Sequence, residues 1–91
     1  MDLKSIRKKL DEAGYKTFIK KSAINKDQEY LVAGLTDKET TLKMDSVFQV
    51  FIEKEKILLS FLNIQSTINR YFNSTETLLV FVKQKFPIPR N

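Results

Sequence analysis

The chain of 91 residues contains no cysteine and no histidine. Without cysteine it can form no disulfide framework, no thiolate nucleophile and no thiolate metal site. Without histidine it has neither the commonest general base nor the commonest protein ligand of zinc. These two absences restrict its chemistry more than any residue that is present.

Glycine and proline are scarce as well, with two residues of each. Neither of the glycine-rich loops that cradle phosphates, G-x-x-x-x-G-K-S/T and G-x-G-x-x-G, occurs in the sequence. Residues 1–13 are charged throughout, unlike a secretory signal, and no apolar run approaches the roughly 18 residues of a membrane span. The sequence therefore predicts a cytoplasmic protein that has no membrane partner.

The remaining candidates for catalysis are carboxylates, lysines and hydroxyl groups, and they form no catalytic pattern. Glu53 and Glu55 could form a carboxylate pair of the glycosidase kind, but they alternate with lysines in what reads as an exposed turn. The acid-x-Lys triplet at residues 2–4 lies at a helix start, whereas a metal-dependent nuclease needs it on a strand. We therefore predict that the protein is not an enzyme, has no catalytic or metal-binding residue and uses no cofactor.

One long apolar stretch, residues 47–62, consists of two apolar runs around the charged insert 53–56. Its β-branched and aromatic residues and its charged break favour a central β-hairpin. Because 53–56 contains neither glycine nor asparagine, we predict a loose four-residue turn. A single long helix is the alternative, since eight residues at helical spacing share one face. They are Met44, Val47, Phe48, Phe51, Glu55, Leu58, Leu59 and Leu62.

The segment before this stretch predicts one helix followed by strands. Residues 2–13 repeat apolar residues at steps of three and four, with Asp2 as the N-cap and Gly14 in the position that ends helices. After this helix, side chains that alternate along the sequence and residues typical of turns predict antiparallel strands. The predicted elements are strand 15–21, turn 24–27, strand 28–35, turn 36–38, and a short third strand, or the first half of a long one, at 40–44.

The segment after the central stretch predicts a last strand at 67–72 and a helix at 75–86. Asn73 and Glu76 have the spacing of a capping box at the start of this helix, and Pro87 ends it. Its buried stripe is predicted to hold Leu78, Leu79, Val82 and Phe86.

Together these elements predict an α+β fold, with an N-terminal helix, an antiparallel sheet of four to five strands around a central hairpin, and a C-terminal helix. Residues 1–86 are expected to form a single compact domain, and residues 87–91 an extended C-terminal tail.

Both faces of the predicted hairpin would be apolar, because successive residues of a strand point to opposite sides. If both helices cover one face, the other face must meet a partner, since large exposed apolar patches are uncommon on soluble monomers. We therefore expect an apolar interface with a protein partner or with a second copy in a homodimer. Its predicted contacts are Phe48, Val50, Ile52, Leu58 and Leu62.

The net charge of +5 is concentrated near the start of the chain. Residues 1–26 hold eight bases and three acids, whereas residues 27–91 hold eight of each. This asymmetry predicts a surface that meets an acidic partner, although a solvated lysine-rich surface would explain it equally well. Lysines beside aromatic residues on strands could also bind nucleic acid. The predicted basic contacts are Lys4, Arg7, Lys8, Lys16, Lys20, Lys21 and Arg70.

These patterns favour a small, non-enzymatic binding or regulatory protein of the bacterial or phage kind, which acts through protein–protein contacts. The alternative is a sequence-tolerant nucleic-acid-binding protein that uses the basic residues named above. None of the usual DNA- or RNA-reading motifs is present, so the protein partner is the leading hypothesis.

Overall fold

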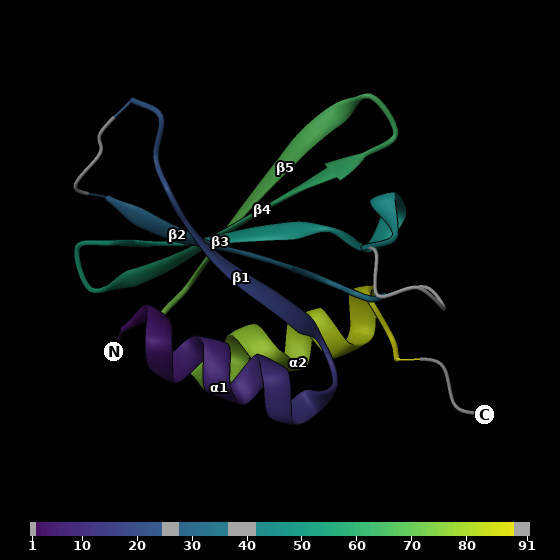
Figure 1. The fold of residues 1–91 in the computed structure, drawn as a ribbon, viewed down its shortest axis with the longest axis horizontal. Helices are drawn as coiled ribbons and strands as arrows, with labels where there is room; N and C mark the ends of the chain where they lie inside the picture. Colours follow the sequence, from purple (N-terminus) through teal and green to yellow (C-terminus); the bar gives the residue numbers. More distant parts are fainter. Residues whose placement is uncertain (1, 25–27, 37–41, 89–91) are drawn as a thin grey trace.

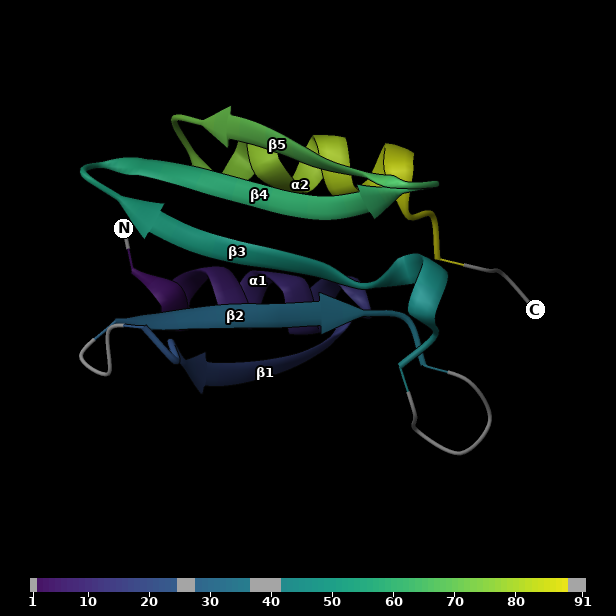
Figure 2. The same cartoon turned by 90° about the horizontal axis from the view of Figure 1, so that it is seen from above.

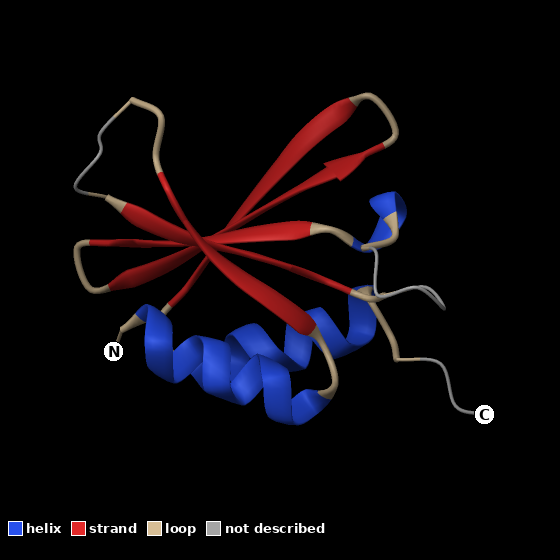
Figure 3. Ribbon diagram, in the orientation of Figure 1, coloured by secondary structure: helices blue, strands red, loops and turns tan. Residues whose placement is uncertain are grey.

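The computed structural model describes residues 2–24, 28–36 and 42–88. Within these residues, two α-helices and a five-stranded antiparallel sheet form an α+β fold, as predicted (Figures 1 and 3). The elements are α1 (Leu3–Ala13), β1 (Lys16–Lys21), β2 (Glu29–Gly34), the short 3-10 helix η1 (Met44–Ser46), β3 (Phe48–Glu53), β4 (Lys56–Asn63), β5 (Ser66–Phe72) and α2 (Thr75–Lys85). None of these helices is long and apolar enough to cross a membrane.

The strands follow one another across the sheet in chain order, and each pairs antiparallel with the next. The predicted central stretch forms the hairpin β3–β4, which spans residues 48–63, so the long-helix alternative is wrong.

The turn of this hairpin is tighter than predicted. Glu53 pairs with Lys56, which leaves Lys54 and Glu55 as a two-residue turn with φ angles of 50° and 48°. Two successive positive φ angles are those of a type I′ turn, whose twist matches that of the flanking strands. The prediction of a loose turn is wrong because the pairing of the two strands imposes this conformation on residues that seldom adopt it.

Both helices lie against the same face of the sheet (Figure 1). α1 packs on β1 and β2, α2 packs on β4 and β5, and the two helices contact each other. Full burial of each large apolar side chain in this layer is worth about 1.5–3 kcal/mol. The buried apolar residues are Ile6, Leu10, Tyr15, Leu31, Ala33, Phe48, Val50, Ile57, Leu59, Phe61, Leu78, Val82 and Phe86.

Local signals set the ends of the helices. The Asp2 carboxylate accepts a hydrogen bond from the N–H of Ser5 at 2.7 Å, which caps α1 and holds the pKa of Asp2 below its ordinary value. Gly14 ends α1 with a φ of 108°. The hydroxyl of Ser74 caps α2 by accepting from a backbone N–H three residues on. The predicted capping role of Asn73 is therefore wrong, because the helix begins one residue later than that spacing implies.

Several predicted turns, the predicted third strand and the predicted tail lie partly or wholly outside the described residues. These are residues 25–27, residues 37 and 38, residues 40 and 41 of the predicted third strand, and residues 89–91 of the tail. In the described part, Leu42 forms only an isolated bridge with Thr36, so a strand over 42–44 is wrong. The Ser46 hydroxyl accepts a hydrogen bond from the N–H of Leu35 at 2.9 Å, which turns the chain back against the end of β2.

Candidate binding surface

The face of the sheet opposite the two helices is covered by no element among the described residues (Figure 2). We name it the open face. Alternate residues of each strand project from it, as the strand register requires. They are Lys16, Phe18 and Lys20 of β1; Tyr30, Val32 and Gly34 of β2; Gln49, Phe51 and Glu53 of β3; Lys56, Leu58, Ser60 and Leu62 of β4; and Thr67, Asn69 and Tyr71 of β5.

An apolar row crosses the open face from β2 to β5. Tyr30 stacks on Phe51, with ring centroids 5.0 Å apart and ring planes 20° apart. Phe51 lies opposite Leu58, and Leu58 lies opposite Tyr71. Tyr71 is 58% exposed, whereas the other three side chains are half-buried. We call these four residues the apolar row, and Lys20, opposite Tyr30, ends it at β1.

The neighbouring row is apolar only on the side of β1. Phe18 lies opposite Val32, and the row continues through Gln49, Ser60 and Asn69. The Phe18 ring is 40% exposed, and the ammonium group of Lys16 lies 5.8 Å from its centroid. Polar side chains therefore border the apolar row on one side.

Charge on the open face is positive at β1 and balanced at the β3–β4 turn. Lys16 and Lys20 both project from β1, which is an edge of the sheet. Beside the apolar row, Glu53 lies opposite Lys56 and accepts a hydrogen bond at 3.3 Å from the hydroxyl of Tyr71, the last residue of the row. A partner that carries carboxylates over β1 would complement this distribution.

The open face is shallow. One depression lies between β3, β4 and β5, and another lies at the β3–β4 turn beside Tyr71. Neither depression is an enclosed cavity, whereas sites for small molecules bury most of the ligand. The shape therefore suits a broad macromolecular partner better than a small ligand.

The residues predicted for the apolar interface fall on both faces of the sheet. Leu58 and Leu62 project from the open face, and Leu62 is 72% exposed. Phe48 and Val50 are fully buried beneath the helices, and Ile52 is half-buried on the same side. Their assignment to an interface is wrong, because the helices cover the side of β3 to which they point.

Sequence reasoning missed the aromatic members of the apolar row as interface residues. Tyr30, Phe51 and Tyr71 lie on three different strands, so only the register of the sheet brings them into line with Leu58. The alternation of side chains along β3 was a usable signal, because it places Phe51 on the face opposite to that of its two neighbours in the sequence. It separates the two faces of β3 without showing which of them the helices cover.

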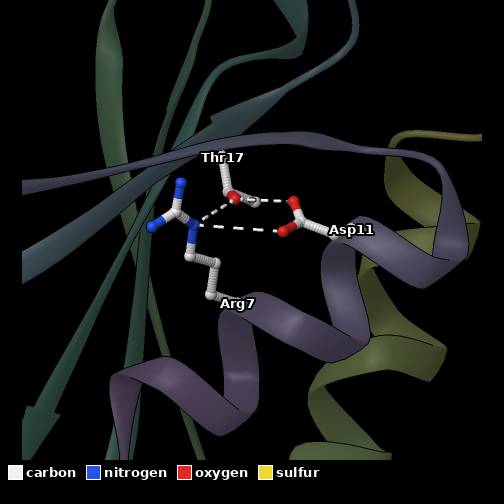
Figure 4. Close-up of polar contacts among 3 residues, drawn as sticks. All are labelled: Arg7, Asp11 and Thr17. Atoms are coloured by element: carbon white, nitrogen blue, oxygen red, sulfur yellow. Dashed lines mark hydrogen bonds and ion pairs between the residues drawn. The ribbon is translucent and has the colours of Figure 1, made fainter.

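The basic residues predicted on the first helix lie on the covered side of the sheet, and one of them is engaged within the fold. Arg7 Nε donates to Thr17 Oγ1 at 3.1 Å and lies 3.9 Å from Asp11 Oδ2, while Thr17 Oγ1 donates to Asp11 Oδ1 at 2.6 Å (Figure 4). Thr17 is buried, so these contacts fix α1 on β1. Lys4 and Lys8 are exposed on the same helix, away from the open face.

The basic residues predicted on strands are also divided. Lys16 and Lys20 share the open face, but Lys21 lies opposite Glu29 on the other face of the same strand pair. Arg70 belongs to β5, at the far edge of the sheet, where its guanidinium carbon lies 5.9 Å from the Phe81 ring centroid. The seven predicted basic contacts therefore do not form one patch.

Comparison of the chain with protein-family models, with curated proteins and with solved structures finds no significant match. In the part of the chain that the structure describes, no group of three or more acidic side chains is placed to hold a metal ion.

Proposed function

We propose that the protein is a non-catalytic binding module that recognises another protein through its open face. The observation that carries the proposal is the apolar row, which crosses four strands on the side that neither helix covers. Contiguous exposed apolar surface is unfavourable in water and commonly marks an interaction site. Tyrosine and phenylalanine are also enriched in protein interfaces, and tyrosine is frequent among the residues that dominate binding energy.

The expected partner presents an apolar surface bordered by carboxylates. Lys20 ends the apolar row, and Lys16 projects from the same strand two positions further along the face. Carboxylates placed over these two lysines would speed association and fix the orientation of the partner. A second copy of the open face is a poorer occupant, because it would present the same positive edge.

Single-stranded nucleic acid is the second candidate. Phe18, Lys16 and Lys20 place one aromatic ring and two ammonium groups on the open face of β1, and such groups can stack on bases and neutralise phosphates. Two features disfavour it. The Tyr30 ring is already stacked within the apolar row, and the carboxylate of Glu53 lies beside the Tyr71 hydroxyl of that row, where it would repel phosphate.

Peptide display tests the proposal. The immobilised protein should enrich, from a random library, peptides that combine apolar and acidic residues. Phe51→Ser combined with Leu58→Ser should weaken the binding of an enriched peptide by about 30-fold, which corresponds to roughly 2 kcal/mol. Lys8→Ser combined with Lys9→Ser, on the exposed side of α1, is the control and should leave the affinity nearly unchanged. Circular dichroism verifies that both double variants are folded.

Titration with oligothymidylate at two salt concentrations distinguishes the second candidate. Oligonucleotide binding that weakens steeply with salt and is lost in Lys16→Glu with Lys20→Glu, without enrichment of any peptide, would assign the open face to nucleic acid. Enriched peptides that bind the open-face variant as tightly as the unmodified protein would place recognition elsewhere. Either result overturns the proposal.

A further inference from the structure

The two edge strands of the sheet differ in how well they are protected from pairing with another strand. β1 carries three lysines, Lys16, Lys20 and Lys21, among its six residues. β5 has seven residues, one charge, Arg70, and no proline. It pairs with β4 along its whole length without a bulge, so its outer edge is regular. Natural sheets block their edges with charged side chains, above all lysine, with proline or with bulges, and Arg70 is the single such device on β5.

We propose that β5 pairs antiparallel with β5 of a second copy of this chain and so extends the sheet across a homodimer. Each lysine-rich β1 edge would repel its own copy, whereas two β5 edges carry little like charge. An edge strand joined to its copy in this way satisfies backbone groups that otherwise face water. The inference concerns the edge of the sheet and does not depend on the function proposed for its open face.

The length and the sequence of β5 favour one register for its pairing with β5 of the second copy. Asn69 is the middle residue of Ser66–Phe72, so a two-fold axis at Asn69 lets all seven residues of each strand pair. Residues that pair across two antiparallel strands project from the same face of the sheet. The two nearest alternative registers therefore place the two-fold axis at Arg70 or at Ile68. The first sets two guanidinium groups directly opposite each other, and the second leaves two residues of each strand unpaired.

The side chains are compatible with the Asn69 register. On the open face, Thr67 meets the partner's Tyr71, and the two Asn69 amides meet at the axis, where each can donate and accept a hydrogen bond. On the covered face, Ile68 meets the partner's Arg70. Each Arg70 stays over its own Phe81 ring. In this arrangement the two open faces lie on the same side of one continuous sheet.

Single cysteines test the register, because the chain contains no cysteine of its own. In the proposed dimer the two Asn69 Cα atoms lie about 4.5–5.5 Å apart, within the span of about 4.4–6.8 Å that a disulfide bridges. Ser66 lies opposite the partner's Phe72, so the two Ser66 Cα atoms are separated by roughly 20 Å. Mild oxidation should therefore link Asn69→Cys into a dimer and leave Ser66→Cys unlinked, although both positions are exposed.

Sedimentation velocity of the full chain over a concentration series gives an independent readout. The unmodified protein should dimerise reversibly as its concentration rises, because a single strand pair makes a small interface. Asn69→Lys places two lysines at the axis and should abolish the dimer. Ser60→Lys is the matched control, since Ser60 pairs with Asn69 on the same face but lies one strand inside the edge, and it should leave the dimer intact.

Two outcomes would overturn the inference. One is a protein that stays monomeric at every concentration. The other is equal oxidative cross-linking of Asn69→Cys and Ser66→Cys, which would show that contact between copies has no defined register. Neither outcome bears on peptide recognition by the open face, so the dimer and the proposed function fail separately.

Discussion

Tyr15 links the end of α1 to the end of α2. Its hydroxyl donates to the carbonyl of Phe86 at 2.5 Å and lies 3.3 Å from the carbonyl oxygen of Val82. The last carbonyls of a helix have no partner within the helix, so this hydroxyl satisfies a buried acceptor. The Tyr15 ring meets Phe48 edge-on, with centroids 5.8 Å apart. One side chain thus joins both helices to the central hairpin.

Tyr15→Phe should lower the free energy of unfolding by about 1–2 kcal/mol, because the carbonyl of Phe86 loses its buried donor. Chemical denaturation measures the change. Tyr71→Phe is the matched control, since its hydroxyl donates to the exposed Glu53 carboxylate and its loss should have little effect on stability. Equal losses in the two variants would contradict the role of Tyr15.

Because of Tyr15, we also expect the stability of the protein to depend on pH in the alkaline range. Burial raises the pKa of Tyr15 above its ordinary value of 10, so the unfolded chain loses this proton first as the pH rises. The folded state then binds more protons than the unfolded state, and stability falls from about pH 10 upward. Denaturation at a series of pH values should show a shallower fall in Tyr15→Phe. An identical slope in both proteins would exclude this contribution.

Among the structural elements, the β3–β4 and β4–β5 hairpins show that strand pairing can override the backbone preference of the residues in a turn. Lys54 and Glu55 have positive φ in the β3–β4 turn, and Ile64 has a φ of 59° in the β4–β5 turn. A β-branched residue in this region is an outlier. The long pairing of β4 with both neighbours compensates for the strain in the two turns.

Lys54→Asn combined with Glu55→Gly should raise the free energy of unfolding by about 1 kcal/mol, because both new residues favour positive φ. In a thermal melt this gain should raise the melting temperature by about 4–8 °C. Lys54→Ala combined with Glu55→Ala removes the same charges without favouring positive φ, and it should not stabilise the protein. Equal melting temperatures for the two double variants would contradict the strain argument.

Elements with local signals were predictable from the sequence. Asp2 and Gly14 mark both ends of α1, and the charged insert 53–56 divides the central hairpin. Features set by distant contacts were not predictable. Alternation separates Phe48 from Phe51 in β3, but the path of the chain through distant strands decides that both helices cover the Phe48 side. Three of the five predicted interface residues were therefore assigned to the wrong face.

In the whole molecule, sequence position was also a poor guide to where charge gathers. The positive charge of residues 4–21 is divided between the exposed side of α1 and the two faces of β1. Alternate residues of a strand project from the same face. Within β1, Lys16 and Lys20 are an even number of residues apart and both project from the open face, whereas Lys21 projects from the other face. Of the described bases in this quarter of the sequence, two lysines therefore reach the candidate surface, at the end of an apolar row built by later strands.

Chemical-shift mapping by NMR with an enriched peptide tests most directly whether the open face is the binding surface. We expect the largest changes on Tyr30, Phe51, Leu58 and Tyr71, and no change on the exposed side of α1. Changes concentrated on α1 and α2, with the apolar row unperturbed, would contradict this expectation.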